Sequence, residues 1–356
     1  MRELLRENIA TLKPYSCARN DFTGEAEVYL DANENWQEFV GREDVNRYPD
    51  PLATMVRKAL EEVLGLPFDQ TIIGNGSDEL IDNLFRCFCR PGKDSVLLMP
   101  PTYGAYRVFA DINDVIVKTV PLTPHFQLDL PALKRCLAEE KASRTNEARL
   151  KLLFICSPNN PSGNAFPLDE VRTICSLFEG IVVVDEAYFD FSSQASAVSL
   201  LGEFENLVVL RTLSKCWALA SARVGVAIAS KEIIAVLRSM KYPYNVGGPS
   251  QDIALKALKQ AQRVKQGLAL IKEERARLRT ELAQVDCVVQ VFDSDANFFL
   301  VRVTDAPSIY HYLLGKGIIV RNRSKEMHCE NCLRITIGSK QENDVLLSAL
   351  KEYEHA

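Results

Sequence analysis

The chain has 356 residues, of which 47% are hydrophobic and 25% charged. This is enough to bury the core of an enzyme-sized protein of about two domains. Its formal net charge of -5 excludes a broad basic surface for nucleic acid or for an anionic membrane, so we expect small-molecule partners. No apolar run approaches the about 20 residues that a membrane-spanning helix needs, and acids interrupt the apolar residues at the start, unlike in a signal peptide. We therefore expect a cytoplasmic protein.

Residues 1–40 show little regular pattern, and we expect them to form an N-terminal arm and part of a smaller domain. In residues 41–246, short apolar runs alternate with helical patterns, which is typical of an α/β domain built on a parallel sheet. A short strand is expected at residues 71–73, directly before a helix. The clearest further strands are predicted at residues 95–99, 115–117, 151–156, 181–184, 207–210 and 224–228.

A proline- and glycine-rich break at residues 242–249 separates this large domain from the rest of the chain. A long helical stretch is predicted from about residue 251 to residue 282. The remaining apolar segments are enough for a small α+β domain, which we assign to residues 247–356. Its strands are expected at residues 287–291, 297–301 and 333–337, and its last helix at residues 341–353.

The ten cysteines do not suggest a disulfide framework. Most of them lie in apolar segments, where a reduced thiol packs as a small hydrophobe. Cys329 and Cys332 form a C-x-x-C that could indicate a metal or redox site. A closed zinc site needs four ligands, however, and no second pair of the usual spacing is present. We predict an ordinary loop there and no bound metal.

The most informative motif is Thr212-Leu213-Ser214-Lys215, which is followed by Arg223. It places a primary amine among hydroxyls and a cation, and this suits an aldehyde cofactor that also carries a phosphate. A desolvated lysine forms a Schiff base with such an aldehyde, and pyridoxal 5'-phosphate (PLP) is the usual partner. Taken alone the motif is weak, because an ordinary surface lysine after a strand fits it about equally well.

A second candidate feature is the turn Gly76-Ser77-Asp78, which lies between an apolar strand and a helical pattern. Backbone N–H groups at a helix start bind phosphate. A plain N-cap formed by Ser77 or Asp78 explains the same residues about as well.

Asp185 ends a strand, and a carboxylate there could keep the ring nitrogen of PLP protonated. Tyr188 and Asn159 could donate hydrogen bonds to the ring oxygen. Each residue by itself is explained by turn formation or packing. Because they follow successive strands, whose carboxyl ends share one edge of the sheet, we expect them to form one site.

Together these residues resemble the fold-type I PLP-dependent aminotransferases, and within them the histidinol-phosphate aminotransferases. The resemblance spans nearly the whole chain and implies a large domain with a mainly parallel seven-stranded sheet plus a smaller α+β domain. The matching motifs lie at residues 14–19, 46–49, 100–103, 157–163, 185–188, 212–215 and 332–338.

The resemblance implies a role for each matching position. Lys215 would bind PLP covalently, and Asp185 would pair with the ring nitrogen. Asn159 and Tyr188 would contact the ring oxygen, and Tyr103 would stack on the ring. These residues would make up the catalytic centre.

The resemblance also implies a phosphate site, a substrate site and a homodimer in which the active sites are shared. The phosphate of PLP would be held by Gly76, Ser77, Asp78, Thr212, Ser214 and Arg223 and, from the other subunit, by Tyr48. The anionic substrate would be bound by Arg321, Arg334, Tyr15, Asn33 and Tyr48.

The implied reaction converts L-histidinol phosphate and 2-oxoglutarate to imidazole acetol phosphate and L-glutamate in histidine biosynthesis. The freed amine of Lys215 would act as the general base, so we expect Arg223 and a closed site to lower its pKa. Three alternatives stay open: a threonine-phosphate decarboxylase, an aromatic amino acid aminotransferase, and a non-enzymatic binding protein that uses Cys329 and Cys332 as a metal or redox sensor.

Overall fold

The computed structural model describes residues 2–13, 15, 27–42, 45–143 and 148–353. In this part of the chain the strands form two sheets, one of seven strands and one of four. The large sheet has the order β1-β7-β6-β5-β4-β2-β3. Strands β2 to β6 pair in parallel, whereas β7 is antiparallel to both of its neighbours. The predicted α/β class and the mainly parallel sheet are confirmed.

Each predicted strand of the large domain is present, with ends that shift by a few residues. Except in β3, apolar residues alternate between the two faces of the sheet, so each of these strands contributes to two hydrophobic cores. The strands are β1 (Thr71–Asn75), β2 (Ser95–Leu98), β3 (Ile116–Thr119), β4 (Leu150–Cys156), β5 (Ile181–Asp185), β6 (Leu207–Thr212) and β7 (Val224–Ala229).

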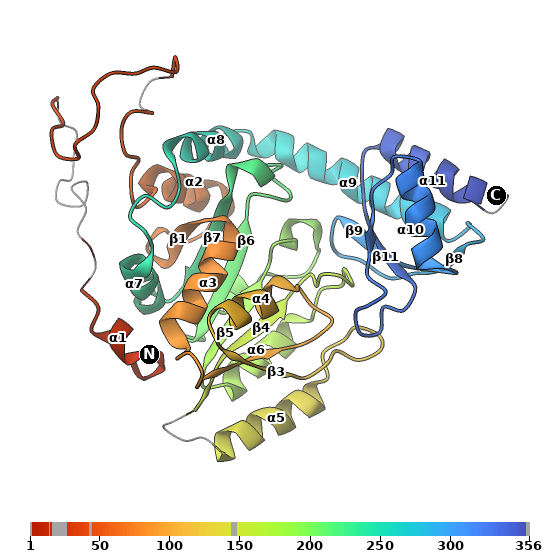
Figure 1. Cartoon of the computed structure of the whole chain (residues 1–356), viewed down its shortest axis with the longest axis horizontal. Helices are drawn as coiled ribbons and strands as arrows, with labels where there is room; N and C mark the ends of the chain where they lie inside the picture. The colour runs from red at the N-terminus through yellow and green to blue at the C-terminus, as the bar shows by residue number, and fades with distance from the viewer. Residues whose placement is uncertain (1, 14, 16–26, 43–44, 144–147, 354–356) are drawn as a thin grey trace.

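Helices cover both faces of the large sheet (Figure 1). One core packs against α3 (Gly76–Phe88), α4 (Ala105–Ile112) and α7 (Lys231–Met240). The core on the other face packs against α2 (Thr54–Leu64), α5 (Leu130–Ala142), α6 (Leu168–Leu177) and α8 (Gly248–Leu258). Short 3-10 helices lie at Arg2–Leu4, Phe68–Gln70, Phe189–Phe191, Ala197–Leu200 and Ala220–Ala222.

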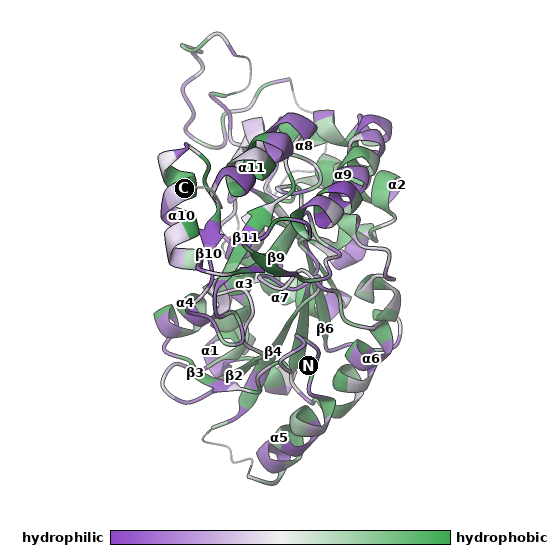
Figure 2. Ribbon diagram, turned by 90° about the vertical axis from the view of Figure 1, so that its right-hand side faces the viewer, coloured by the Kyte–Doolittle hydropathy of each residue, from purple (hydrophilic) through white to green (hydrophobic). Residues whose placement is uncertain are grey.

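The predicted helical stretch at 251–282 is two helices, because the chain breaks at Lys259 and Gln260 between α8 and α9 (Ala261–Leu282). Helix α8 packs beside α2, and α9 runs on to the four-stranded sheet (Figure 1). Figure 2 shows that α9 carries many hydrophilic residues along its length. The proposed domain boundary at residues 246/247 stays a prediction.

The four-stranded sheet is antiparallel, with the order β10-β11-β9-β8. It packs with α9, α10 and α11 around a separate core. Its elements are β8 (Val288–Val291), β9 (Phe298–Val303), α10 (Ala306–Gly315), β10 (Arg321–Asn322), β11 (Cys332–Thr336) and α11 (Lys340–Tyr353). The predicted small α+β unit is confirmed, with β10 as an additional short strand.

Near the N-terminus, α1 (Glu7–Ala10) lies against the large domain, and residues 27–42 extend away from it (Figure 1). None of the helices in the described part of the chain combines the length and apolarity required to cross a bilayer.

Candidate active site

Asp185 is the last residue of β5, at the edge of the sheet where open α/β proteins bind ligands. Its side chain is buried. Oδ2 accepts a 2.7 Å hydrogen bond from the hydroxyl of Tyr106, and Oδ1 accepts a 3.1 Å bond from the N–H of Ala187. Burial raises the pKa of Asp185 to about 6, although both hydrogen bonds act in the opposite direction. A buried carboxylate in this place is suited to hold a cationic nitrogen.

Tyr103 lies beside this carboxylate, between β2 and α4. Its ring meets that of Tyr106 edge-on, with 5.3 Å between centroids, and its hydroxyl donates a 3.3 Å bond to Oδ1 of Asp78. Burial, together with the charges of Asp78 and Asp185, raises the pKa of Tyr103 to about 12. The ring is therefore neutral at physiological pH and is placed where a planar ligand could stack on it.

Lys215 follows β6 and is an exposed residue. Its Nζ lies 5.4 Å from the ring centroid of Tyr188. The surrounding walls still desolvate the amine in part, which lowers the pKa of Lys215, and the charge of Arg334 lowers that pKa further. Asp185 acts in the opposite direction, and Arg223 has the smaller effect among these charges. The expected lowering is confirmed, but Arg334 and not Arg223 is the leading charge.

Asn159 lies in the loop after β4 and is buried. Its Nδ2 donates to the carbonyl oxygen of Pro101 at 3.0 Å and to Oγ of Ser162 at 2.7 Å. Its Oδ1 accepts a 3.1 Å bond from the hydroxyl of Thr102. One N–H group of this amide therefore bonds within its own loop and the other bonds to the segment after β2.

Asn160, which the sequence analysis missed, is a second amide in this loop. Its Nδ2 is 3.4 Å from the hydroxyl of Tyr188, and its Oδ1 accepts a 2.6 Å bond from Nη1 of Arg334. Burial raises the pKa of Tyr188 well above its usual range, so its hydroxyl stays protonated. The role at the ring oxygen predicted for Asn159 stays a prediction, and these contacts make Asn160 a second candidate for it.

The start of α3, which the sequence predicts to hold a phosphate, has features of an anion cradle. First-turn N–H groups of a helix lack intrahelical acceptors, and the helix dipole favours an anion there. Gly76 has a φ of 75°, and a Cβ on it would lie 2.4 Å from Nη2 of Arg223. A Cβ on Gly225 of β7 would lie 2.3 Å from the backbone nitrogen of Ser77. Glycine at both positions lets β7 and a guanidinium approach the helix start closely.

The other predicted phosphate residues gather around this cradle. Thr212 pairs with Gly225 in the sheet, and its hydroxyl lies 3.0 Å from Oγ of Ser214. Nη2 of Arg223 lies 3.2 Å from Oδ2 of Asp78. Two hydroxyls, one guanidinium and the helix start thus meet at one place, which is a suitable set of donors for a phosphate.

Arg321 and Arg334 face each other across β10 and β11 of the small sheet, so their side chains lie on one face. Burial lowers the pKa of Arg334, and the nearby Arg323 and Arg321 lower it further. Arg323 was not singled out from the sequence; its Nη1 pairs with Oε1 of Glu326 at 2.7 Å. These guanidinium groups form a positive field suited to an anionic substrate.

Three of the residues predicted to bind the substrate, Tyr48, Asn33 and Tyr15, lie apart from Arg321 and Arg334 within the chain. Tyr48 stacks on Tyr244 with 4.4 Å between ring centroids and is half exposed. Asn33 has a φ of 55° in the extended segment near the N-terminus. The neighbouring Glu34 accepts from the N–H of Tyr48 at 2.6 Å and pairs with Arg47 at 2.8 Å, which ties this segment to Tyr48.

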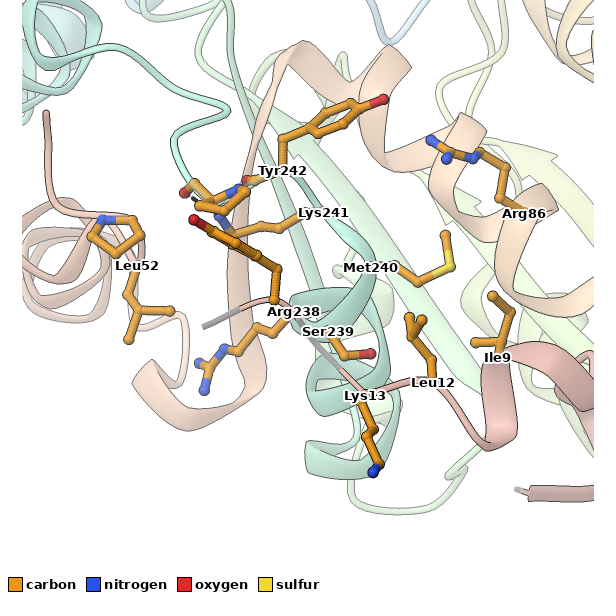
Figure 3. Close-up of a pocket in the computed structure, with 13 residues that line it drawn as sticks. Ile9, Leu12, Lys13, Leu52, Arg86, Arg238, Ser239, Met240, Lys241 and Tyr242 are labelled. Carbon is orange, nitrogen blue, oxygen red and sulfur yellow. Dashed lines mark hydrogen bonds between the residues drawn. The ribbon is translucent and has the colours of Figure 1, made fainter. Parts of the chain in front are cut away.

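Tyr15 is exposed and lines a pocket of about 420 Å³ between α1, α3 and the end of α7 (Figure 3). Figure 3 shows Arg86, Arg238 and Lys241 around this pocket, with Leu12 from the N-terminal segment. Lys215, Asp185, Tyr188 and Arg334 do not line this pocket. The matching motif at residues 14–19 lies, except for Tyr15, outside the described residues.

Cys329 and Cys332 are buried free thiols. Burial raises the pKa of Cys329 to about 12 and also raises that of Cys332. Their turn lies between the strands that carry Arg321 and Arg334 and packs into a hydrophobic core. Within the described residues there is no cluster of three or more potential metal ligands of the His, Cys, Asp and Glu types.

Comparison with known proteins gives matches over nearly the whole chain. The sequence model of aminotransferase class I and II matches residues 18–350. The histidinol-phosphate aminotransferase of Cytophaga hutchinsonii is 46% identical over 350 residues, 98% of each chain. The solved histidinol-phosphate aminotransferase of Clostridium acetobutylicum has a TM-score of 0.79 at 25% identity and covers 88% of this chain and 92% of its own. That of Sinorhizobium meliloti, in complex with pyridoxal-5'-phosphate, has a TM-score of 0.78 at 23% identity over 88% and 85% of the two chains, which shows the shared fold.

Proposed function

Because the chain belongs to the aminotransferase class I and II family, we propose that it transfers the amino group of L-histidinol phosphate to 2-oxoglutarate in histidine biosynthesis. The products are imidazole acetol phosphate and L-glutamate. The observation that carries the proposal is the position of Lys215, whose amine interacts electrostatically with Asp185, with Asp78 in the first turn of α3 and with Arg334. The identity of 46% over nearly the full length supports the choice of substrate.

PLP fits the residues that are present. Asp185 is a buried carboxylate that needs a cationic partner. Gly76 and Gly225 let Arg223 and β7 lie close to the start of α3, whose first-turn N–H groups suit a phosphate. When bound, PLP supplies the electron sink that stabilises negative charge on the substrate's α-carbon.

The chain's own residues then have separate tasks. Asp185 holds the proton on the ring nitrogen, and Tyr188, together with Asn159 or Asn160, provides hydrogen bonds at the ring oxygen. Lys215 accepts the proton from the α-carbon of the substrate and later returns it, for which its amine must be neutral. The lowered pKa of Lys215 increases that neutral fraction.

Arg321 and Arg334 bind the anionic end of the substrate. A guanidinium group forms paired hydrogen bonds equally well with a phosphate and with a carboxylate. One pocket can therefore take histidinol phosphate in the first half of the reaction and 2-oxoglutarate in the second.

The proposal includes a homodimer in which Tyr48 of each chain completes the site of the other. The extended segment carries large apolar side chains that pack on little within its own chain: Leu30 is 90% exposed, Trp36 77% and Phe39 76%. Such a run is typical of a surface that contacts another protein. Tyr15 and Asn33 form no hydrogen bond with Lys215 or Arg334 within the described part of the chain, so we assign their substrate contacts to the partner's site. We also propose that the protein is cytoplasmic, as expected from the sequence.

The visible absorption of the PLP-loaded protein tests this function. L-histidinol phosphate alone should bleach the cofactor band, and 2-oxoglutarate should restore it with formation of L-glutamate. Carbon dioxide release from threonine phosphate without a keto acid would support the decarboxylase instead. Equal bleaching by phenylalanine or tyrosine, which lack a phosphate, would support the aromatic aminotransferase.

A further inference from the structure

Tyr106 lies in the first turn of α4 and is fully buried. Its hydroxyl donates a 2.7 Å hydrogen bond to Oδ2 of Asp185. We propose that Tyr106 is a positioning residue, which fixes the orientation of the Asp185 carboxylate and keeps it ionised for the ring nitrogen of the cofactor. This inference rests on the function proposed above for Asp185.

The ring of Tyr106 is held in place by aromatic packing on two sides. It stacks on Phe154 of β4, with 4.7 Å between centroids and 24° between the planes. Its other side meets Tyr103 edge-on at 5.3 Å and 89°. A side chain packed in this way has little rotational freedom, so its hydroxyl is a fixed donor. It also links Asp185 to the ring that we expect to stack on the cofactor.

The two carboxylate oxygens of Asp185 are held by different donors. Oδ1 accepts from the backbone N–H of Ala187, which no side-chain substitution removes. Oδ2 depends on Tyr106, the one side chain in the described part of the chain that donates to it. A hydrogen bond of this kind stabilises the charged form of the carboxylate. Without it the charged carboxylate is less stable, and Asp185 should take up a proton more readily.

Other charged or titratable groups near Asp185 also affect its pKa. The carboxylates of Asp78 and Glu186 raise the pKa of Asp185, in addition to burial. These groups stay in place when the hydroxyl of Tyr106 is removed, so a change in Asp185 can be assigned to the lost hydrogen bond. The groups that surround Asp185 are Tyr106, Cys156, Asp78, Glu186, Tyr103, Tyr188 and Lys215.

The test is an infrared pH titration of Asp185 in the full-length, cofactor-free protein. The carbonyl band of the protonated carboxyl is assigned by its loss in Asp185→Asn. In Tyr106→Phe we expect the midpoint to rise by about one pH unit, which is a tenfold higher proton affinity. The affinity for PLP at pH 6.5 should fall by about threefold, because a larger share of the Asp185 carboxyls then carries a proton. Tyr310→Phe in α10, far from this site in the fold, is the matched control and should leave both values unchanged.

A second variant covers the case in which Tyr106→Phe does not fold. Replacement of Tyr106 by 3-fluorotyrosine keeps the ring and makes the hydroxyl a stronger donor, so the midpoint should move down. A folded Tyr106→Phe protein with an unchanged midpoint, or a fluorinated protein whose midpoint rises, would overturn the proposal. The titration uses neither cofactor nor substrate, so its outcome is independent of whether the proposed aminotransferase reaction is correct.

Discussion

The pKa of Lys215 depends first on partial desolvation and then on the positive charge of Arg334. Arg223 is closer in sequence, but it is exposed and paired with Asp78 at 3.2 Å, which offsets much of its charge. Arg334 reaches the site from β11 and is itself partly desolvated. The residue proposed to bind the substrate therefore also keeps the lysine ready to react.

Removal of the charge in Arg334→Gln should raise the pKa of Lys215, by up to about one unit. Only the neutral amine reacts with an aldehyde, so the rate at which cofactor-free protein binds PLP increases with pH through that pKa. The whole profile should move to higher pH in the variant. Stopped-flow measurement of PLP binding between pH 6 and about 10 checks this.

Arg107→Gln is the matched control for this measurement, because Arg107 pairs with Asp111 on the exposed side of α4. Its profile should coincide with that of the unchanged protein. An Arg334→Gln profile that stays in place or moves to lower pH would contradict the assigned role of Arg334.

At the level of single residues, the sequence predicted the types of groups well and their exact assignment less well. Asp185, Tyr188 and Lys215 lie together as expected, because they end or follow neighbouring strands. Asn159 and Asn160 are adjacent in one motif, and only the hydrogen bonds distinguish the surroundings of the two amides. Tyr106 has no motif signal, since a buried tyrosine on an apolar helix face usually belongs to the core.

Among the secondary structure elements, β7 and the start of α3 approach so closely that no side chain fits between them at Gly225. Gly225 faces the backbone of Gly76 and Ser77, and an added Cβ would approach both within 2.3 Å. A backbone contact of this kind cannot be relieved by rotation of a side chain. The start of α3 would have to move, together with the anion cradle.

Gly225→Ala should therefore reduce both stability and cofactor binding. We expect a loss of about 1–3 kcal/mol in the free energy of unfolding, as is typical of overpacking. The affinity for PLP should fall by about tenfold, because phosphate donors move out of position. Urea unfolding and a fluorescence titration with PLP measure the two effects.

Gly202→Ala serves as the comparison, because a Cβ at Gly202 would have no atom within 4 Å. It should leave both properties close to those of the unchanged protein. If Gly225→Ala behaves like Gly202→Ala, the close approach of β7 to α3 does not shape the cradle.

At this scale the strands were predictable because they are short, apolar and bounded by turn residues. The break at Lys259 and Gln260 was not, since neither residue terminates a helix by its own preference. Helix α8 packs beside α2, so tertiary contacts decide where the helical stretch divides. Strand β10 has only two residues, Arg321 and Asn322, and its pairing with β11 gives no periodic signal in the sequence.

Across the whole molecule, the site is assembled from segments far apart in the sequence. The large sheet supplies Asp185 and Lys215, and the small sheet supplies Arg334 about 120 residues later. Tyr48 stays apart from them within one chain, where it stacks on Tyr244. The proposed homodimer would bring Tyr48 of a second copy to the site, and the exposed apolar segment around Trp36 and Phe39 supports that proposal.

Mixed dimers test whether the sites are shared. A chain with Lys215→Ala and a chain with Tyr48→Glu should each be nearly inactive, because the glutamate repels the cofactor's phosphate. After mixing through unfolding and refolding, we expect about a quarter of the normal activity, since half of the dimers are hybrids with one intact site. Unchanged protein taken through the same steps controls for refolding. Activity no higher than that of the two parents would show that Tyr48 acts within its own chain.

The central claim is that the amine of Lys215 binds PLP covalently, and borohydride reduction tests it most directly. The PLP-loaded protein is reduced, digested and mapped by mass spectrometry. We predict a stable pyridoxyl label on the peptide that contains Lys215, and none after prior removal of PLP. A label on another lysine, or no label on a protein that still catalyses amino transfer, would contradict the account.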